Sequence, residues 1–417
     1  MKVHCPRSVL VISGMLLSIC LFIYCVDKHP STPQPARPDT PPEPYAGSLS
    51  CAGCHKNIYD THIHTAHYLT SQAASLKNIK GSFASGENKF IFSDYTHVAM
   101  EKRKDGLYQV EYNEGVERKA RRFDITVGSG TKGQTYLYWW KDSLFQLPIS
   151  WFTAANQWSN SPGYLRVAFG RPITSRCLEC HSTYVHVTSP PDARVEEYDH
   201  NILFGVDCER CHGPGLKHVQ FHGQHPEEKT GKFIINPASF TRQQKLDLCI
   251  FCHGGRLEKT KPSFSFQPGD TLTNYFAMDT AQLNAADIDV HGNQYGLLAA
   301  SKCFRMSQMT CNTCHNTHVN EAGKPALFSE RCMTCHQDNS ATHPQPASAP
   351  ACKLKTLSAT QLKQNCIDCH MPLQPSQAIM VQLEGETAPT SAYMRTHFIK
   401  VYPDETKKFL QSVKKSK

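Results

Sequence analysis

One short pattern, Cys-x-x-Cys-His, occurs seven times in this chain of 417 residues and uses 14 of its 19 cysteines. It is the attachment motif of c-type haem, in which two thiols add to the vinyl groups of one porphyrin and the histidine binds the iron as its proximal ligand. The copies are numbered here as sites 1 to 7 in chain order. They are Cys51, Cys54 and His55; Cys177, Cys180 and His181; Cys208, Cys211 and His212; Cys249, Cys252 and His253; Cys311, Cys314 and His315; Cys332, Cys335 and His336; and Cys366, Cys369 and His370.

Other uses of paired cysteines do not explain this repetition. Zinc ribbons take Cys-x-x-Cys in pairs, and seven is an odd number. A thioredoxin-like dithiol would occur once, beside a βαβ pattern. Neither reading requires a histidine after every second cysteine. We therefore predict seven covalently attached haem c groups, with their iron.

Covalent haem c also predicts where the chain works. In bacteria the attachment takes place outside the cytoplasm, so the chain must be exported. We expect it in the bacterial cell envelope, on the periplasmic side of the inner membrane.

Residues 1–29 are predicted to be an N-terminal membrane anchor or a signal peptide. Lys2 and Arg7 precede an uncharged run over residues 8–26, which is close to the length of about 20 residues that spans a membrane. The apolar part of a secretory signal is usually about 7–15 residues long. An uncleaved anchor with its N-terminus in the cytoplasm is therefore favoured over a cleaved signal. Residues 30–48 are rich in proline and predict an extended linker.

The spacing of the motifs predicts a mostly α and irregular fold built around stacked haems. Sites 2 to 7 follow one another at short intervals between residues 177 and 370. Such short segments cannot each bury a core of side chains, so the porphyrins are expected to fill the interior. The predicted segments are a haem 1 segment at 49–89, a haem-rich domain with haems 2–7 at 166–400 and a basic tail at 401–417.

The long interval between sites 1 and 2 has a different pattern. Runs rich in β-branched and aromatic residues alternate with turn signals, of which Asp105-Gly106 is the strongest. We predict a small antiparallel β unit at residues 90–165, inserted between haems 1 and 2. The four tryptophans, Trp139, Trp140, Trp151 and Trp158, lie in this unit. Core packing is the simplest role for them; a partner-docking face or one wall of a haem pocket are the alternatives.

The remaining histidines are candidates for the second, distal iron ligand. Of the 22 histidines, seven are proximal, and His4 and His29 lie in or beside the predicted anchor, which leaves 13 for seven irons. This surplus favours two histidine ligands per iron over a histidine and a methionine. The predicted distal ligands are His67, His218, His222, His291, His318 and His397, with His62 and His64 as rivals of His67. The seventh is open among His186, His343 and His97, and if none of them binds, one iron has a free position.

Three stretches carry a family resemblance. They are residues 205–215 with His218, residues 292–318, and residues 366–372, where the sequence reads Cys-Ile-Asp-Cys-His-Met-Pro. Over roughly residues 50–400 the chain resembles multihaem cytochromes of the cytochrome c-552/c-554 domain family. The aromatic stretch at 147–164 is similar to one branch of that group. The resemblance implies bis-histidine haems stacked in close pairs and electron transfer outside the cytoplasm. One relative, the electron acceptor of hydroxylamine oxidoreductase, has four haems, so its partner is not carried over to seven.

The net charge and the cysteines outside the motifs say less about function than the haem motifs do. The formal charge is +8, but a ferric bis-histidine haem with two ionised propionates adds about −1, so seven of them bring the total to about +1. Nucleic acid binding therefore has no support. The basic C-terminus is either a solvated end or a contact for anionic lipid. Cys303 and Cys352, which lie outside the motifs, are expected either to form a disulfide or to be two free thiols.

Two functions follow from this pattern. The first is an exported, membrane-anchored electron carrier whose partners are other redox proteins or quinol-linked membrane complexes. The second is a multihaem oxidoreductase that acts on a small nitrogen or sulfur compound at one open haem. No Cys-x-x-Cys-Lys variant occurs, which weighs against the lysine-ligated nitrite reductases. The pattern is closer to an electron-transfer protein than to an enzyme, and a structural role as a filament or scaffold is the third alternative.

Overall fold

The computed structural model describes residues 44–164, 169–278, 284–336, 352, 354 and 357–415. All of them fall in one unit of the chain. The predicted anchor at 1–29 and most of the linker at 30–48 lie outside these residues. Within the described ranges, no helix combines the length and the apolar character that crossing a bilayer requires.

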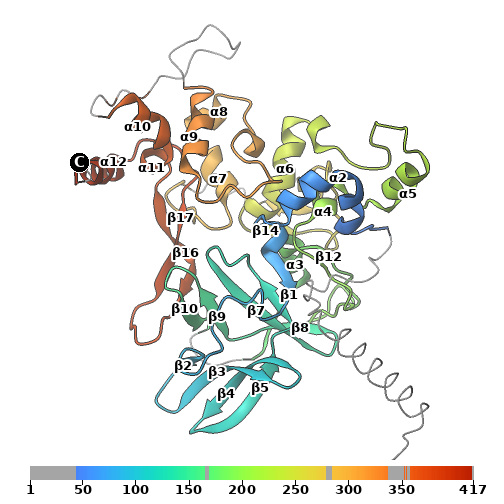
Figure 1. The fold of residues 1–417 in the computed structure, drawn as a ribbon, viewed down its shortest axis with the longest axis vertical. Helices are drawn as coiled ribbons and strands as arrows, with labels where there is room; N and C mark the ends of the chain where they lie inside the picture. The colour runs from blue at the N-terminus through green and yellow to red at the C-terminus, as the bar shows by residue number, and fades with distance from the viewer. Residues whose placement is uncertain are drawn as a thin grey trace, which may run out of the picture. The chain divides into compact units, whose positions relative to one another are not determined.

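A four-stranded antiparallel sheet forms one end of this unit (Figure 1). Its order is β2 (Lys89–Ile91), β3 (Thr96–Arg103), β4 (Gly106–Asn113) and β5 (Val116–Arg122). The predicted turn signal Asp105-Gly106 lies where β3 turns into β4. Between β4 and β5, Glu114 and Gly115 both have a positive φ, of 52° and 75°. That combination is what the tight type I′ turn of a two-residue hairpin requires.

A second sheet has seven strands and carries most of the core. Its path is β1–β6–β7–β8–β11, with β9 beside β7 and β10 beside β9. The strands are β1 (Ser71–Ala73), β6 (Ile125–Val127), β7 (Gly133–Trp140), β8 (Ser143–Gln146), β9 (Ile149–Phe152), β10 (Gln157–Asn160) and β11 (Arg171–Pro172).

Alternate side chains of β7 enter two different cores, because successive residues of a strand point to opposite faces. On one face, Tyr136 packs with Trp158 in a core shared with the four-stranded sheet. Leu137 packs on the other face with Leu144 and Leu178. Leu178 lies between the two cysteines of site 2, so this sheet is the support on which that motif rests.

The four tryptophans have different surroundings. Trp158 is buried in the aromatic core, with Trp151 perpendicular to it at 5.6 Å between ring centres. Trp139 stacks on His200 at 4.1 Å. Trp140 is 53% exposed and lies beneath the guanidinium of Arg121. Core packing therefore accounts for Trp158 and, as partly buried neighbours of the two cores, for Trp151 and Trp139, whereas Trp140 is exposed.

Most of the helices lie at the other end of Figure 1, and α2, α3, α4, α6, α9 and α11 carry residues of the haem motifs. They are α2 (Ser48–His62), α3 (Ser175–His181), α4 (Cys208–His212), α5 (Leu216–Gln224), α6 (Arg242–His253), α7 (Gln294–Ala299), α8 (Lys302–Arg305), α9 (Pro325–Met333), α10 (Ala359–Gln364), α11 (Cys366–His370) and α12 (Pro403–Lys415). The 3-10 turns are η1 (Tyr68–Thr70), η2 (Pro237–Ser239), η3 (Leu272–Asn274) and η4 (Cys311–Thr313).

The prediction of a mostly α and irregular fold with one small β unit is wrong. The described residues hold five sheets, three of which are ribbons in the haem-rich part of the chain. The ribbons are β12 (Ser182–Tyr184) with β13 (Leu203–Phe204), β14 (Leu257–Lys259) with β15 (Phe276–Met278), and β16 (Leu373–Val381) with β17 (Thr390–Arg395).

The sequence did not reveal these sheets because many of their strands are short and pair with strands that are distant in the chain. β1, inside the predicted haem 1 segment, pairs with β6 across a long stretch of chain. The β16–β17 ribbon packs Val381 and Leu383 against Phe152, and Leu383 forms a bridge with Ser159 of β10. Strands of two or three residues show no period-two pattern, so hydropathy alone does not reveal them.

The core on the haem side of the seven-stranded sheet gives the first test. Leu144 is fully buried, whereas Leu76 is 54% exposed. We expect Leu144→Ala to cost about 2–5 kcal/mol of stability, because it leaves a cavity, and to lower the melting temperature followed by circular dichroism. Leu76→Ala is the matched control and should leave the melting temperature nearly unchanged. Equal shifts in the two variants would contradict this assignment of the core.

Candidate haem-binding sites

All seven motifs adopt helical or turn backbone. Sites 2, 3 and 7 occupy α3, α4 and α11, and site 4 forms the end of α6; site 1 begins near the start of α2, site 5 lies in η4, and site 6 begins at the end of α9. Helical backbone brings residues three and four apart onto one face. At sites 2, 3, 4 and 7, whose motifs are helical throughout, the two thiols and the imidazole therefore lie on the same side, as attachment to one porphyrin needs.

Four proximal histidines face a second histidine at a constant separation. The ring centres are 6.4 Å apart for His55 and His218, and 6.2 Å apart for His212 and His318, His253 and His67, and His315 and His397. Two imidazoles that bind one metal ion from opposite sides, with metal–nitrogen bonds of about 2 Å, hold their ring centres roughly 6 Å apart. Each pair has the spacing of two axial ligands of a single iron, so these residues fit haem.

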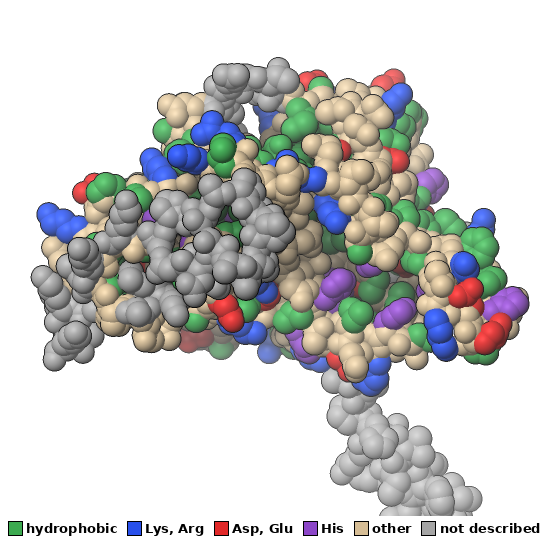
Figure 2. Space-filling view, turned by 90° about the horizontal axis from the view of Figure 1, so that it is seen from above, with side chains coloured by type: hydrophobic (Ala, Val, Ile, Leu, Met, Phe, Trp, Pro, Cys, Tyr) green, Lys and Arg blue, Asp and Glu red, His purple; other side chains and the backbone are tan. Residues whose placement is uncertain are grey.

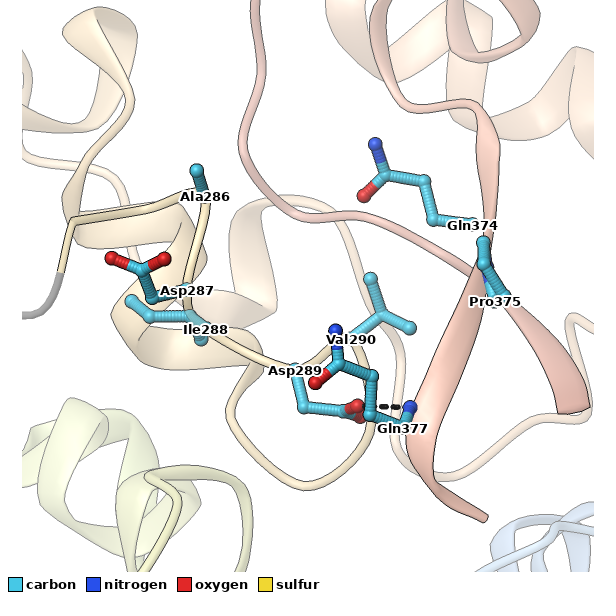
Figure 3. A pocket seen from close by; sticks show the side chains of 8 residues that line it. All are labelled: Ala286, Asp287, Ile288, Asp289, Val290, Gln374, Pro375 and Gln377. Carbon is cyan, nitrogen blue, oxygen red and sulfur yellow. Dashed lines mark hydrogen bonds between the residues drawn. The ribbon is translucent and has the colours of Figure 1, made fainter. Parts of the chain in front are cut away.

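At site 2, the neighbour of His181 is His291. Burial, followed by repulsion from the imidazoles of His291 and His253, lowers the pKa of His181 to about 4. The backbone N–H of His291 donates to the carboxylate of Asp289 at 2.7 Å. The same carboxylate accepts from the Ser376 hydroxyl at 3.0 Å and from the backbone N–H of Gln377 (Figure 3). Asp289 thus fixes the His291 loop to β16.

A hollow of about 250 Å³ lies beside this loop. It is lined by residues 286–290 on one side and by Gln374, Pro375 and Gln377 of β16 on the other (Figure 3). Its lining contains two carboxylates, of Asp287 and Asp289. The carboxylate of Asp289 also accepts from the backbone N–H of Ala378 at 3.2 Å, so four donors hold it. The residues that line the hollow thus support the His291 loop.

Hydrogen bonds to Nδ1 orient several of these rings. The Nδ1 of His212 lies 2.9 Å from the carbonyl oxygen of Ile235, and that of His218 lies 2.7 Å from the carbonyl oxygen of Lys232. The corresponding partners are the Thr70 hydroxyl for His181, the Gln294 side chain for His253 and the Lys400 carbonyl for His370. A histidine that donates from Nδ1 presents Nε2 to a metal, which is the usual arrangement of an imidazole ligand.

The protonation state of the buried histidines also suits them as iron ligands. Burial is the main cause that lowers the pKa of His67 and of His397 to about 4. It also lowers the pKa values of His253, His315 and His318. At neutral pH these imidazoles are uncharged, as binding to a metal requires. Figure 2 views the end of the molecule that holds most of the helices. It shows histidines at several places on the surface, some of them in recesses.

Other predicted ligands lie elsewhere. The Nε2 of His222 accepts a hydrogen bond from the backbone N–H of Lys232 at 3.2 Å, and its ring touches His218 at 4.5 Å between ring centres. His62 is buried, with its Nδ1 3.3 Å from the carbonyl oxygen of Thr317 and its ring perpendicular to His318. His64 is exposed. The structure therefore brings His67, not His62 or His64, to face a proximal histidine.

The three open choices for the seventh ligand lie away from the motifs or beyond the described residues. His97 stacks on Tyr112 in the four-stranded sheet at 5.1 Å. His186 is 3.6 Å from the carboxylate of Asp199. His343 lies outside the described residues. Cys303 and Cys352 do not form a disulfide with each other in the described part of the chain.

Several supporting residues have no signal in the sequence. Thr70, Gln294 and Asp289 meet the iron-site histidines only through the fold, and they are polar residues of ordinary spacing. Arg176 and Arg210 lie beside motif cysteines in the sequence, and their stacking on Phe251 is a tertiary contact. Only the position of the arginines next to or inside a motif could have drawn attention to them.

Comparison with known proteins supports the same picture. The sequence profile of the family Cytochrome c554 and c-prime matches residues 154–213, which include sites 2 and 3. The fold is similar to that in the crystal structure of the outer cell wall cytochrome OcwA, with a TM-score of 0.53 and 16% identity over 87% of this chain and 81% of that chain. No curated protein matches the chain significantly.

The chain is a multihaem c-type cytochrome. The family profile carries this conclusion together with the haem motifs, and the likeness to OcwA shows the fold. A cytochrome of this kind has covalently bound haem c with its iron, and electron transfer is the activity that such a protein supports.

The pair at site 1 gives a test with a built-in control. His218 faces His55, whereas the Nε2 of His222 is bonded to the backbone, so only His218 is placed to bind the iron. Replacing a histidine ligand by methionine raises the reduction potential of a haem. We expect His218→Met to raise the midpoint potential of one haem and to produce the absorption band of an iron–sulfur bond. His222→Met should do neither, and the reverse result would exchange the two assignments.

The pair at site 4 differs from the others in its ring orientation. The planes of His67 and His253 meet at 66°, whereas those of the pairs at sites 1, 3 and 5 meet at 17°, 25° and 31°. Nearly perpendicular ligand planes give a low-spin ferric haem a more anisotropic EPR signal than nearly parallel planes do. We expect site 4 to give such a signal in the oxidised cytochrome, and this signal to be lost in His67→Met. A signal that survives this substitution would show that site 4 has another distal ligand.

Proposed function

We propose that the cytochrome is an exported electron carrier with seven haem c groups, which passes electrons between redox partners through irons with two histidine ligands. The observation that supports it most directly is the set of four histidine pairs at 6.2–6.4 Å. An iron with two imidazole ligands has no position for a substrate. Its chemistry is the gain and loss of one electron.

The proposed ligand pairs are His55 with His218, His181 with His291, His212 with His318, His253 with His67, and His315 with His397. Haem iron, when bound, supplies the redox chemistry by changing between the ferric and ferrous states. The chain contributes rigid support: Nδ1 partners fix the rings of His181, His212 and His253. Burial lowers the pKa values of His67 and His397 and so favours their neutral form. Because the ligand geometry is fixed before the electron arrives, little rearrangement accompanies its transfer.

The arginines near the motifs suit the charge of the cofactors. Arg331 donates to the carbonyl of Cys314 and pairs with Glu321 at its other edge. Arg395 donates to the carbonyls of Ile367 and Met371 around site 7. Guanidinium groups so close to the motifs are suitable partners for ionised propionates.

The site of action is part of the proposal. Residues 1–29 would hold the cytochrome to the inner membrane, and the proline-rich linker at 30–48 would keep the haem-bearing part at a distance from the lipid. Partners on that side would be other redox proteins or quinol-linked membrane complexes. These elements rest on the sequence.

Spin-quantified EPR of the fully oxidised protein tests this function. We expect all of the iron to be low-spin and the spin count to equal seven haems per chain, because each iron would have two strong ligands. About one seventh of the iron in a high-spin state would contradict the proposal. It would favour an oxidoreductase of a small nitrogen or sulfur compound at one open haem, and carbon monoxide binding by the reduced protein would then identify that haem.

A further inference from the structure

Four pairs of motifs touch through their thiols. The thiols that share hydrogen bonds are Cys51 with Cys208, Cys180 with Cys252, Cys249 with Cys311, and Cys332 with Cys366. The helices or turns that carry these cysteines also contact one another in each case. A motif thiol bonds to the edge of its porphyrin. Contact between two thiols of different motifs therefore brings two porphyrin edges together, at sites 1 and 3, 2 and 4, 4 and 5, and 6 and 7.

Site 4 occurs twice in this set, and its aromatic residue makes further contacts. Phe251, between Cys249 and Cys252, is 3% exposed. The guanidinium of Arg176, next to the first cysteine of site 2, lies 5.0 Å from the centre of this ring and donates to the carbonyl oxygen of Phe251 at 2.8 Å. The guanidinium of Arg210, inside the motif of site 3, lies 4.5 Å from the same ring. Sites 2 and 3 thus both pack on site 4.

The opposite side of site 4 leads to site 5. Besides the contact of Cys249 with Cys311, Arg242 at the start of α6 donates to the carbonyl oxygen of Met309 at 3.2 Å. The connection then continues along the chain. Arg331, next to the first cysteine of site 6, donates to the carbonyl oxygen of Cys314 in site 5 at 2.5 Å. The contact of Cys332 with Cys366 joins site 6 to site 7.

Site 1 is joined to the others through site 3. Glu209, between Cys208 and Cys211, is 6% exposed. Its carboxylate accepts hydrogen bonds from the backbone N–H groups of Ala46 and Gly47, both at 2.8 Å. These residues immediately precede α2, which carries site 1, so one buried carboxylate fixes the start of α2 to the motif of site 3. Arg210 also donates to the carbonyl oxygen of Glu179, so sites 2 and 3 touch as well.

We propose that the haem array of this cytochrome branches at site 4, whose motif contacts those of sites 2, 3 and 5, with Phe251 at the centre of the junction. The inference rests on the proposed function, because it takes each motif to hold a haem. One arm runs through site 3 to site 1, and a second runs through sites 5 and 6 to site 7. Site 2 is the third neighbour of site 4 and also contacts site 3, so the ends of the array are sites 1 and 7.

The test counts the magnetic neighbours of one haem. His67→Met raises the potential of haem 4, so the variant can be poised with haem 4 ferrous and diamagnetic while the other six remain ferric. Ferric haems next to it then lose a paramagnetic neighbour, and their electron spin relaxation slows. We expect slower relaxation for half of the six remaining haem spins, those of sites 2, 3 and 5. A change in a third of them, which is what an unbranched array gives, would overturn the junction.

His218→Met is the matched control, because the same substitution then acts at an end of the array. With haem 1 ferrous, we expect slower relaxation for one sixth of the remaining spins, that of site 3. Equal counts in the two variants would also overturn the junction. A cytochrome with fewer than seven haems, or with no spectral change in either variant, would instead contradict the proposed function.

A further variant keeps all of the proposed iron ligands. Arg210→Gln removes a positive charge beside sites 2, 3 and 4, which favours the ferric state, and we expect lower midpoint potentials for three haems in an EPR-monitored titration. Arg118→Gln, on the exposed edge strand β5, is the control and should change none. A shift confined to one haem would contradict the shared junction.

Discussion

Pairs of histidines that face each other at 6.2–6.4 Å connect the parts of this protein that carry haem motifs. In each pair one histidine belongs to a motif and the other comes from a distant segment. His67, just after α2, meets His253 at the end of α6, and His397, beyond β17, meets His315 after η4. When such a pair binds one iron, it fastens two segments as a cross-link would. The helices around site 4 also have a hydrophobic core of their own, in which Leu246 of α6 packs with Phe276 and Phe304.

Carboxylates that hold backbone N–H groups complete this arrangement. Glu209 fixes the start of α2 and the turn at Gly215, and Asp289 fixes the loop of His291 to β16. Burial of a carboxylate is costly unless several donors satisfy it. Both residues have at least three donors, which suits a role in geometry. The seven-stranded sheet adds the remaining support through Leu178, inside site 2.

The sequence predicts the chemistry of the sites better than the fold around them. Seven copies of one motif are enough to predict haem c, because each copy contains all the residues that attach the cofactor. The distal ligands remain predictions, and the fold shows why they are hard to choose: His218 and His222 lie on one face of α5, and only the loop at Lys232 distinguishes them. The extent of β-structure was beyond reach, since β1, β11 and β13 are two or three residues long and are stabilised by partners far away in the chain.

The position of His397 has a consequence for the maturation of the protein. This histidine lies after the last motif, yet it faces His315 of site 5. A chain that emerges with its N-terminus first presents sites 1 to 7 before it presents His397. If His397 is the distal ligand of site 5, as proposed, the ligand set of that site is complete only after the end of the chain has been made. Loss of the C-terminal segment would then remove this ligand and leave all seven motifs in the chain.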